Sequence, residues 1–208
     1  MRDAIIEPVL IRDILGVATV NKPALFRQTF GLAMGYPAQE VSLQKLLGRL
    51  QETGNVTTIK HYLELLEGDF LLRVLPKYSG SQMRQRASSP KLVPLSTALV
   101  HAFRSPAAVD KDPEWRGRVL EAAVGAALTR SRGSLFYWRQ GGLEVDYVLD
   151  REGVVYGIEI KSGRRRSSRG LPAFLDRYPG AVPVIVERAK AEELLAAPDV
   201  DAVLADGR

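Results

Sequence analysis

The sequence predicts a mixed α+β / α/β protein built in two parts, with helices dominating the first half and strands and helices alternating in the second. Three observations predict this class. Apolar residues recur at helical spacing through most of residues 21–68. Residues 134–161 instead hold three apolar runs separated by short polar turns. Residues 105–115 interrupt both patterns with prolines and aspartates. We therefore expect a helical linker (1–20), an N-terminal domain (21–108) and a C-terminal domain (109–208).

The composition of the 208-residue chain is that of a globular protein with a sizeable core, with 46% hydrophobic and 25% charged residues. No apolar run is long enough to cross a bilayer, and Arg2, Asp3 and Glu7 interrupt any signal peptide. There is no cysteine, which excludes disulfides and thiolate metal sites. We expect a cytoplasmic protein that does not enter a membrane.

The N-terminal half begins with predicted helices over residues 3–15 and 23–33. Asn21 is expected to cap the second of these, with Pro23 in its first turn. A third helix follows Ser42, its expected cap, and carries its apolar side chains on one face: Leu43, Leu46, Leu47 and Leu50.

The next predicted helix, residues 56–68, is capped by Asn55 and carries a buried stripe of Ile59, Tyr62, Leu63 and Leu66. These two short helices are joined by a Gly-containing turn and are followed by predicted strands at 70–76 and 91–96, with a basic loop between the strands. This arrangement predicts a winged helix. Many winged helices bind protein partners and never touch DNA, and Glu64 and Glu67 on the second helix count against deep insertion into a groove. Both kinds of partner therefore stay open.

Charge favours an anionic partner for this half. The net charge is +5, and no carboxylate occurs between Asp69 and Asp110. The alternative is a solvated basic loop. The candidate phosphate contacts on the helix and the wing are Lys60, His61, Arg84, Arg86 and Lys91.

The C-terminal half is predicted to have the element order α-β-β-β-α-β, followed by a short helix and a possible last strand. The predicted helices cover residues 114–130, 167–178 (capped by Ser167 or Ser168) and 190–197, and the predicted strands cover 134–140, 143–150, 154–161, 181–187 and 201–205.

Charged residues inside two of these strands indicate a site. Glu159 and Lys161 are two residues apart and share a face, as do Glu144 and Asp146, opposite Val145, Tyr147 and Leu149. If paired strands align their polar faces, Asp146, Glu159 and Lys161 converge. Isolated buried carboxylates cost several kcal/mol unless they are paired or bind a metal.

Glu121 is a third candidate carboxylate. It lies four residues after Gly117 and four before Gly125, on one helical face whose glycines allow close backbone approach to the sheet. The alternative is a solvent-exposed glutamate on an amphipathic helix.

The set formed by Glu121, Asp146 and the Glu159-Ile160-Lys161 tripeptide, in this element order, resembles the PD-(D/E)XK nuclease superfamily, whose domain is restriction-endonuclease-like. Val145 stands where the family often has proline. The resemblance implies that Asp146 and Glu159, with the Ile160 carbonyl, bind Mg²⁺ or Mn²⁺ and that Glu121 is an outer or second-metal ligand. Lys161 would orient the attacking water or stabilise the charged transition state.

The arginines that follow this tripeptide are candidate phosphate ligands: Arg164, Arg165, Arg166 and Arg169. A solvated loop is the alternative. Tyr137 and Trp138 are expected in the core and not as base-stacking residues.

A second resemblance covers nearly the whole chain. The segments "NKPALFRQTF", "TTIKHYLELLEGDFLLRVLPKYSG", "YWRQGGLEVDYVL" and "GIEIKSG" are similar to the C-terminal region, of DUF4143 type, of prokaryotic AAA-type ATPases. Ser96-Thr97-Ala98 replaces the usual aspartate-threonine-glycine motif. No phosphate-binding G-x-x-x-x-G-K-[ST] run occurs, so we expect no ATP site and a chain that is a fragment or relic of a longer ATPase.

Two functions follow. The first is a metal-dependent DNA nuclease whose winged helix positions the substrate. The second is a non-catalytic module that binds nucleic acid or protein, in its regulatory form sensing DNA for a separate ATPase domain or subunit. The sequence does not set the oligomeric state.

Overall fold

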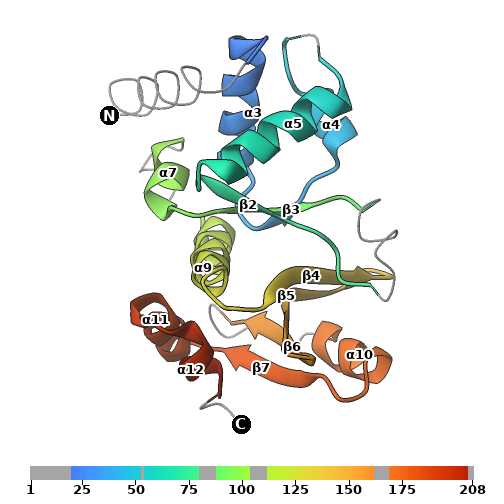
Figure 1. The fold of residues 1–208 in the computed structure, drawn as a ribbon, viewed down its shortest axis with the longest axis vertical. Coiled ribbons are helices and arrows are strands. Elements are labelled where there is room, and N and C mark those ends of the chain that lie inside the picture. The colour runs from blue at the N-terminus through green and yellow to red at the C-terminus, as the bar shows by residue number, and fades with distance from the viewer. Residues whose placement is uncertain (1–19, 53, 80–87, 104–111, 162–168, 206–208) are drawn as a thin grey trace. The chain divides into compact units, whose positions relative to one another are not determined.

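The computed structural model describes residues 20–52, 54–79, 88–103, 112–161 and 169–205 (Figure 1). The helix expected over residues 3–15 lies outside them. The chain forms two compact units: unit 1 combines residues up to Val74 with Ser89–Ala122, and unit 2 combines Leu75–Ser88 with Ala123–Arg208. The last boundary between the units, after Ala122, falls inside one continuous helix, α9 (Pro113–Leu128).

Unit 1 contains the helices α3 (Pro23–Gly35), α4 (Leu43–Leu47), α5 (Val56–Gly68) and α7 (Thr97–Ala102). Two caps are confirmed: Ser42 Oγ accepts the N–H of Lys45, and Asn55 Oδ1 accepts the N–H of Thr58 at 2.8 Å. The cap expected at Asn21 is wrong. Lys22 is the N-cap of α3, and its N–H donates to the Tyr62 hydroxyl, which fixes how the chain enters the helix.

The sheet of unit 1 has the order β1-β3-β2, with β1 (Gln39–Glu40), β2 (Leu72–Leu75) and β3 (Lys91–Pro94). All four residues of the central strand β3 are buried. The buried stripe predicted for α5 is confirmed at each position and packs with Phe26, Phe30 and Trp115 in one hydrophobic core. The helices α4 and α5 therefore share one hydrophobic core with the sheet.

The sheet of unit 2 has the order β4-β5-β6-β7. Strands β4 (Ser134–Gln140), β5 (Leu143–Arg151) and β6 (Val154–Ile160) are antiparallel, and β7 (Val182–Val186) runs parallel to β6 after the crossover helix α10 (Gly170–Arg177). These elements confirm the predicted α-β-β-β-α-β order. Within the described part of the chain, no helix is long and apolar enough to span a membrane.

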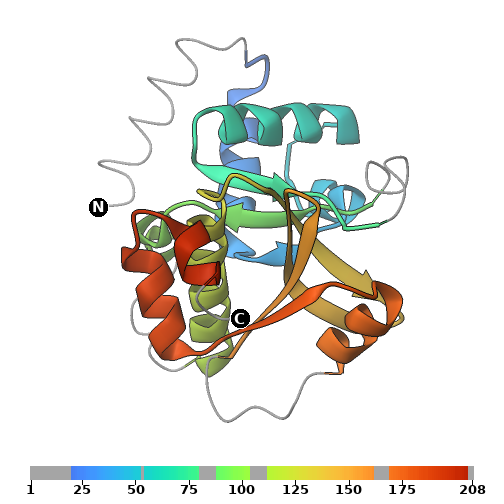
Figure 2. The same ribbon diagram turned by 60° about the horizontal axis from the view of Figure 1, so that its bottom comes forward.

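Helices cover both faces of this sheet (Figures 1 and 2). On one face, a Cβ added to Gly157 of β6 would lie 2.9 Å from Phe174 of α10. On the other, a Cβ added to Gly125 of α9 would lie 2.2 Å from the hydroxyl oxygen of Tyr147 on β5. The close approach expected at Gly125 is confirmed, because only glycine leaves room for that buried ring.

The C-terminus differs from the prediction. Residues 201–205 were expected as a strand but belong to the helix α12 (Val200–Ala205), which follows α11 (Arg188–Ala196). Asp199 Oδ1 accepts the N–H groups of Asp201 and Ala202, as a helix cap does. The buried residues Val200, Val203 and Leu204 have helical spacing, which five residues of sequence are too few to show.

Strand β5 is not regular. Its pairing with β4 shifts between Phe136↔Val148 and Trp138↔Val145, so that two residues, Asp146 and Tyr147, stand opposite one. This β-bulge places Val145 and Val148, three residues apart, in the cluster packed with α10, while Tyr147 approaches α9. The prediction that Val145 shares a face with Tyr147 is therefore wrong.

A segment that follows β2 extends the sheet of unit 2 at its free edge. Tyr78 N–H donates to the Tyr137 carbonyl at 2.7 Å, Tyr137 N–H donates to the Pro76 carbonyl, and Lys77 bridges Tyr137 in parallel. The edge of β4 is thereby covered by residues that lie about 60 positions earlier in the chain.

Candidate functional site

The two parts of the acidic motif meet through one hydrogen bond. The Ile160 N–H donates to Asp146 Oδ2 at 2.7 Å, although the residues are 14 positions apart. Asp146 lies in the bulge of β5, where two residues oppose one, so its side chain reaches across to the last residue of β6. The bulge thus re-aims the carboxylate toward the Glu159-Ile160-Lys161 segment.

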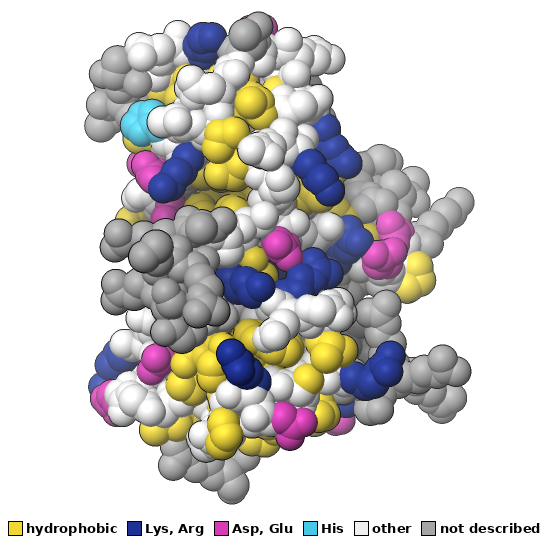
Figure 3. Space-filling view, turned by 90° about the vertical axis from the view of Figure 1, so that its right-hand side faces the viewer, with side chains coloured by type: hydrophobic (Ala, Val, Ile, Leu, Met, Phe, Trp, Pro, Cys, Tyr) yellow, Lys and Arg dark blue, Asp and Glu magenta, His cyan; other side chains and the backbone are white. Residues whose placement is uncertain are grey.

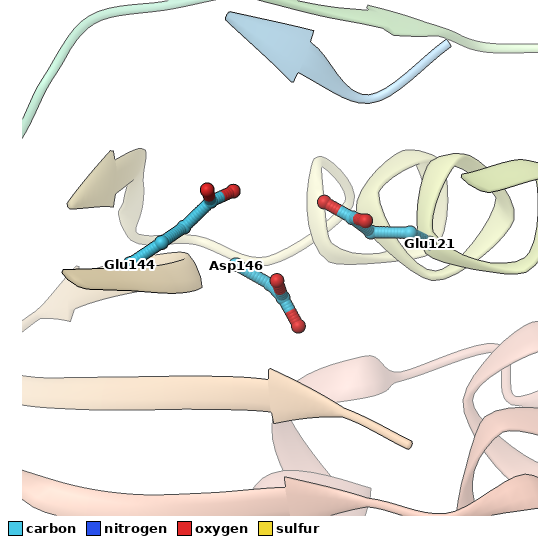
Figure 4. Close-up of side chains that lie close together, drawn as sticks. All are labelled: Glu121, Glu144 and Asp146. Atoms are coloured by element: carbon cyan, nitrogen blue, oxygen red, sulfur yellow. The ribbon is translucent and has the colours of Figure 1, made fainter. Parts of the chain in front are cut away.

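Three carboxylates gather at this end of β5 (Figure 4). Glu121, Glu144 and Asp146 each offer an oxygen, and the three oxygens lie within 4.8 Å of one another. Glu121 comes from α9, one helical turn before Gly125, and the other two come from β5. Of the residues predicted for the site, this group therefore includes Glu121 and Asp146.

Glu159 and Lys161 lie at the end of β6 but outside that group. Glu159 is buried, with 9% of its surface exposed, and alternation puts it on the face of β6 that Gly157 presents to α10. Lys161 N–H donates to the Val186 carbonyl, which holds the half-buried lysine beside the end of β7. Glu144 stands in the acidic group where the sequence led us to expect Glu159.

A lysine already pairs with one of these carboxylates. Lys91 Nζ lies 2.5 Å from Glu121 Oε1, and only 1% of the Lys91 side chain is exposed. Lys91 was expected among the phosphate ligands of the wing. Its ammonium group is instead buried on the central strand β3, where a solvated phosphate does not reach it.

The other expected nucleic-acid ligands divide in two. Lys60 and His61 are exposed on α5, and Arg169 is exposed immediately before α10. Arg84, Arg86, Arg164, Arg165 and Arg166 lie outside the described residues. Tyr137 and Trp138 are buried, which confirms them as core residues.

Two functional candidates, Glu144 and Lys91, were missed or misplaced by sequence reasoning. Glu144 carried a signal, because it shares the alternation of Asp146 on the same strand. Lys91 carried none, since its partner lies 30 residues away on another element.

The donor set suits a hard divalent cation, because carboxylate oxygens are the ligands that Mg²⁺ and Mn²⁺ prefer. Two of the three carboxylates already have cationic protein partners, because Lys91 pairs with Glu121 and Arg139 pairs with Glu144 at 3.2 Å.

A second ionic cluster, centred on Asp201 in unit 2, serves the fold. Burial alone would raise the pKa of Asp201. Hydrogen bonds from the Ser131 hydroxyl, the Arg132 N–H and the Arg151 and Arg132 guanidinium groups outweigh it and lower the pKa to about 2. Asp201 in turn raises the pKa of Arg151 through their hydrogen bond. The cluster joins β5, α12 and the turn after α9.

Together, the fold and the acidic group define a two-unit α+β protein with a carboxylate-rich candidate site. Residues 1–110, more than half of the chain, match the family model described as Domain of unknown function (DUF8612), and the chain belongs to that family. Residues 116–198 match Domain of unknown function (DUF4143). The resemblance to regions of that type, expected over nearly the whole chain, is therefore confirmed for residues 116–198, whereas residues 1–110 match a different family model.

No curated protein matches the chain. Among solved structures, protein VC1899 from Vibrio cholerae is similar at 16% sequence identity and a TM-score of 0.23. The similarity covers 88% of this chain and 54% of that one, so this chain spans about half the length of that protein.

Proposed function

We propose that the chain is a metal-dependent DNA nuclease module, with a winged helix in unit 1 that binds DNA and a PD-(D/E)XK-like domain in unit 2 that hydrolyses it. The observation that carries the proposal is the Asp146–Ile160 hydrogen bond, because it brings the aspartate of the motif to its Glu-x-Lys strand. The element order of unit 2 supports the same assignment.

The winged helix is supported by the order α3-β1-α4-α5-β2-β3 and by the three-stranded sheet behind it. The outer face of α5 exposes Thr57, Lys60 and His61, which are residues suited to phosphate and groove contacts. Glu64 is exposed on the same helix and would weaken deep insertion into a groove.

In this mechanism, Mg²⁺ or Mn²⁺ bound at the site would lower the pKa of a water molecule and so supply the nucleophile. Asp146 would hold the ion, with Glu121 as an outer ligand and Glu144 as an additional oxygen donor beside Asp146. Glu159, the second metal ligand of the motif, would have to turn its side chain from the α10 face toward Asp146 to reach the same ion. Lys161 would orient the water or stabilise the charge that develops on the phosphate oxygens. Lys91 restrains Glu121 and offsets part of the negative charge.

The test is DNA cleavage by the wild type, Asp146→Ala and Asp146→Asn, with linear, circular and single-stranded DNA in Mg²⁺, Mn²⁺ or EDTA. Asparagine keeps an acceptor for the Ile160 N–H, so it removes the charge without removing that hydrogen bond. Asp150→Asn, four residues along the same strand, is the matched control. We expect cleavage that needs metal, falls to background in both Asp146 variants and persists in the control.

The alternative is a module that binds nucleic acid or protein without hydrolysis, for a separate ATPase domain or subunit. The burial of Lys91 against Glu121 favours it, because one candidate ligand is already paired with a protein cation. Absence of cleavage under every condition, with DNA binding unchanged in Asp146→Ala, would replace the nuclease by this module.

A further inference from the structure

An open cavity of about 450 Å³ lies on unit 2, at the end of α10. Two tyrosines and an arginine line it, together with Gly153, Val155, Pro179, Gly180 and Ala181. The residues are Tyr78, Tyr178 and Arg177, from the segment after β2 and from the end of α10. This volume is within the usual range of small-molecule sites.

The tyrosine rings are held in place by other aromatic rings. The Tyr178 ring centroid lies 4.8 Å from that of Phe174 and 5.1 Å from that of Tyr78, which in turn lies 5.4 Å from that of Phe136. Phe174 and Trp138 are buried, whereas Tyr78 and Tyr178 are only half-buried at the opening. The cavity therefore presents preorganised aromatic rings, which lose little entropy when a planar ligand packs on them.

The rest of the lining leaves room and supplies charge. Gly153 and Gly180 have φ of +80° and +96°, and no atom lies within 4 Å of where their Cβ would be. Arg177 is exposed in the last turn of α10, and in the part of the chain that the structure describes it forms no ion pair. Burial, with Asp150 and Tyr178 nearby, raises the pKa of Tyr78, so its hydroxyl stays a protonated donor at neutral pH.

We infer that this cavity binds a nucleotide, with the base packed against Tyr78 and Tyr178 and the phosphate held by the Arg177 guanidinium. Aromatic faces and a neighbouring cation are the elements that recognise a base and its phosphate. Figure 3 shows hydrophobic side chains gathered over the part of the molecule that contains α10 in Figure 1, which fits an aromatic ligand there. The ligand is a free mononucleotide or an unpaired position of a nucleic-acid strand.

This site is separate from the acidic group. Val155 lines the cavity and pairs with Asp150 of β5, whereas Asp146 of the acidic group lies four residues away along β5, about 13 Å at the rise of an extended chain. Between them, α10 packs over Gly157. The inference therefore stands without metal or hydrolysis and is tested in EDTA.

The experiment measures the affinity of the full chain for thymidine monophosphate, a labelled 12-nucleotide oligothymidylate and the same oligonucleotide as a duplex. Tyr178→Leu keeps an apolar side chain against Phe174 but removes the stacking ring. Arg177→Gln changes only an exposed residue, and Arg188→Gln, exposed on α11, is its matched control. We expect Tyr178→Leu to weaken binding by about 5- to 100-fold.

We expect Arg177→Gln to weaken binding and to lower the salt dependence of the affinity by about one phosphate contact. The control Arg188→Gln should bind like the wild type. Competition by the mononucleotide identifies a free nucleotide as ligand, and binding of the single strand alone identifies an unpaired strand position. The inference fails if neither probe binds, if folded variants keep affinity within twofold, or if Arg188→Gln loses as much as Arg177→Gln. Should Tyr178→Leu not fold, Arg177→Gln decides.

Discussion

At the scale of single residues, Lys91 shows how a basic side chain can be misjudged from sequence. It is one of several cations in a stretch without carboxylates, which favoured a surface role. The structure buries it and pairs its ammonium group with Glu121 at 2.5 Å. A buried charge depends on the groups that pair with it, because those interactions offset the cost of its desolvation.

Lys91→Met is therefore expected to destabilise unit 1 by about 2–4 kcal/mol, because it leaves the Glu121 carboxylate without its cation. The double variant Lys91→Met/Glu121→Gln should recover most of that loss, since no uncompensated charge remains. Urea unfolding followed by Trp115 fluorescence in a Trp138→Phe background measures both values. Equal destabilisation in the single and double variants would show that lost packing, and not the ion pair, is responsible.

Other residue-level features could be read in advance. Asn55 and the apolar stripe of α5 are encoded within 13 consecutive residues, so local pattern was sufficient. Asp146 was found because its charge interrupts an apolar strand. Its hydrogen bond to Ile160, and the presence of Glu144 beside it, depend on a bulge that strict alternation does not reveal.

At the scale of elements, the buried carboxylate of Asp201 holds three segments of unit 2 together. It accepts hydrogen bonds from Ser131 and Arg132 after α9, and it pairs with Arg151 at the end of β5. These contacts join residues 50 to 70 positions apart. Sequence inspection placed Asp201 in a strand, because the contacts that favour α12 are long-range.

The stability of unit 2 should fall in acid as Asp201 protonates. Its pKa is about 2 in the folded protein, below the ordinary value of 3.8. Its contribution to the free energy of unfolding is therefore complete above about pH 4 and is lost as the pH falls toward 2. The shift corresponds to about 2 kcal/mol. Urea unfolding of wild type and Asp201→Asn between pH 7 and pH 2 measures this contribution as the difference between their free energies of unfolding.

The difference between wild type and Asp201→Asn should shrink across that interval. Asp176→Asn, an exposed position on α10, serves as the control and should follow the wild type throughout. A difference that stays constant down to pH 2 would mean that shape, and not charge, explains the role of Asp201.

At the scale of the whole molecule, α9 contributes to both compact units. Trp115, in its first turn, belongs to the core of unit 1, and Gly125, near its end, packs against Tyr147 of unit 2. The division expected from the proline-rich segment at 105–115 reflects composition. The compact units instead reflect contacts, which the order of residues in the chain does not reveal.

Each unit contains one of the chain's two tryptophans, Trp115 and Trp138. Because α9 is one helix, we expect the variants Trp115→Phe and Trp138→Phe to give coincident urea midpoints, each reporting the remaining tryptophan. Helix content followed by circular dichroism on the same samples checks that neither substitution perturbs the fold. Two separated midpoints would show that the units unfold independently despite the shared helix.

The pairing of Tyr78 with Tyr137 also sets an order of events during synthesis. Residues 76–78 leave the ribosome about 60 residues before β4, so at usual elongation rates their partner is missing for about 3–12 s. During that time Tyr78 cannot form its hydrogen bonds with β4 or pack against the aromatic rings of unit 2. The nascent chain therefore exposes a segment that can pair with other chains, and the time available for such misassociation depends on how quickly β4 is synthesised.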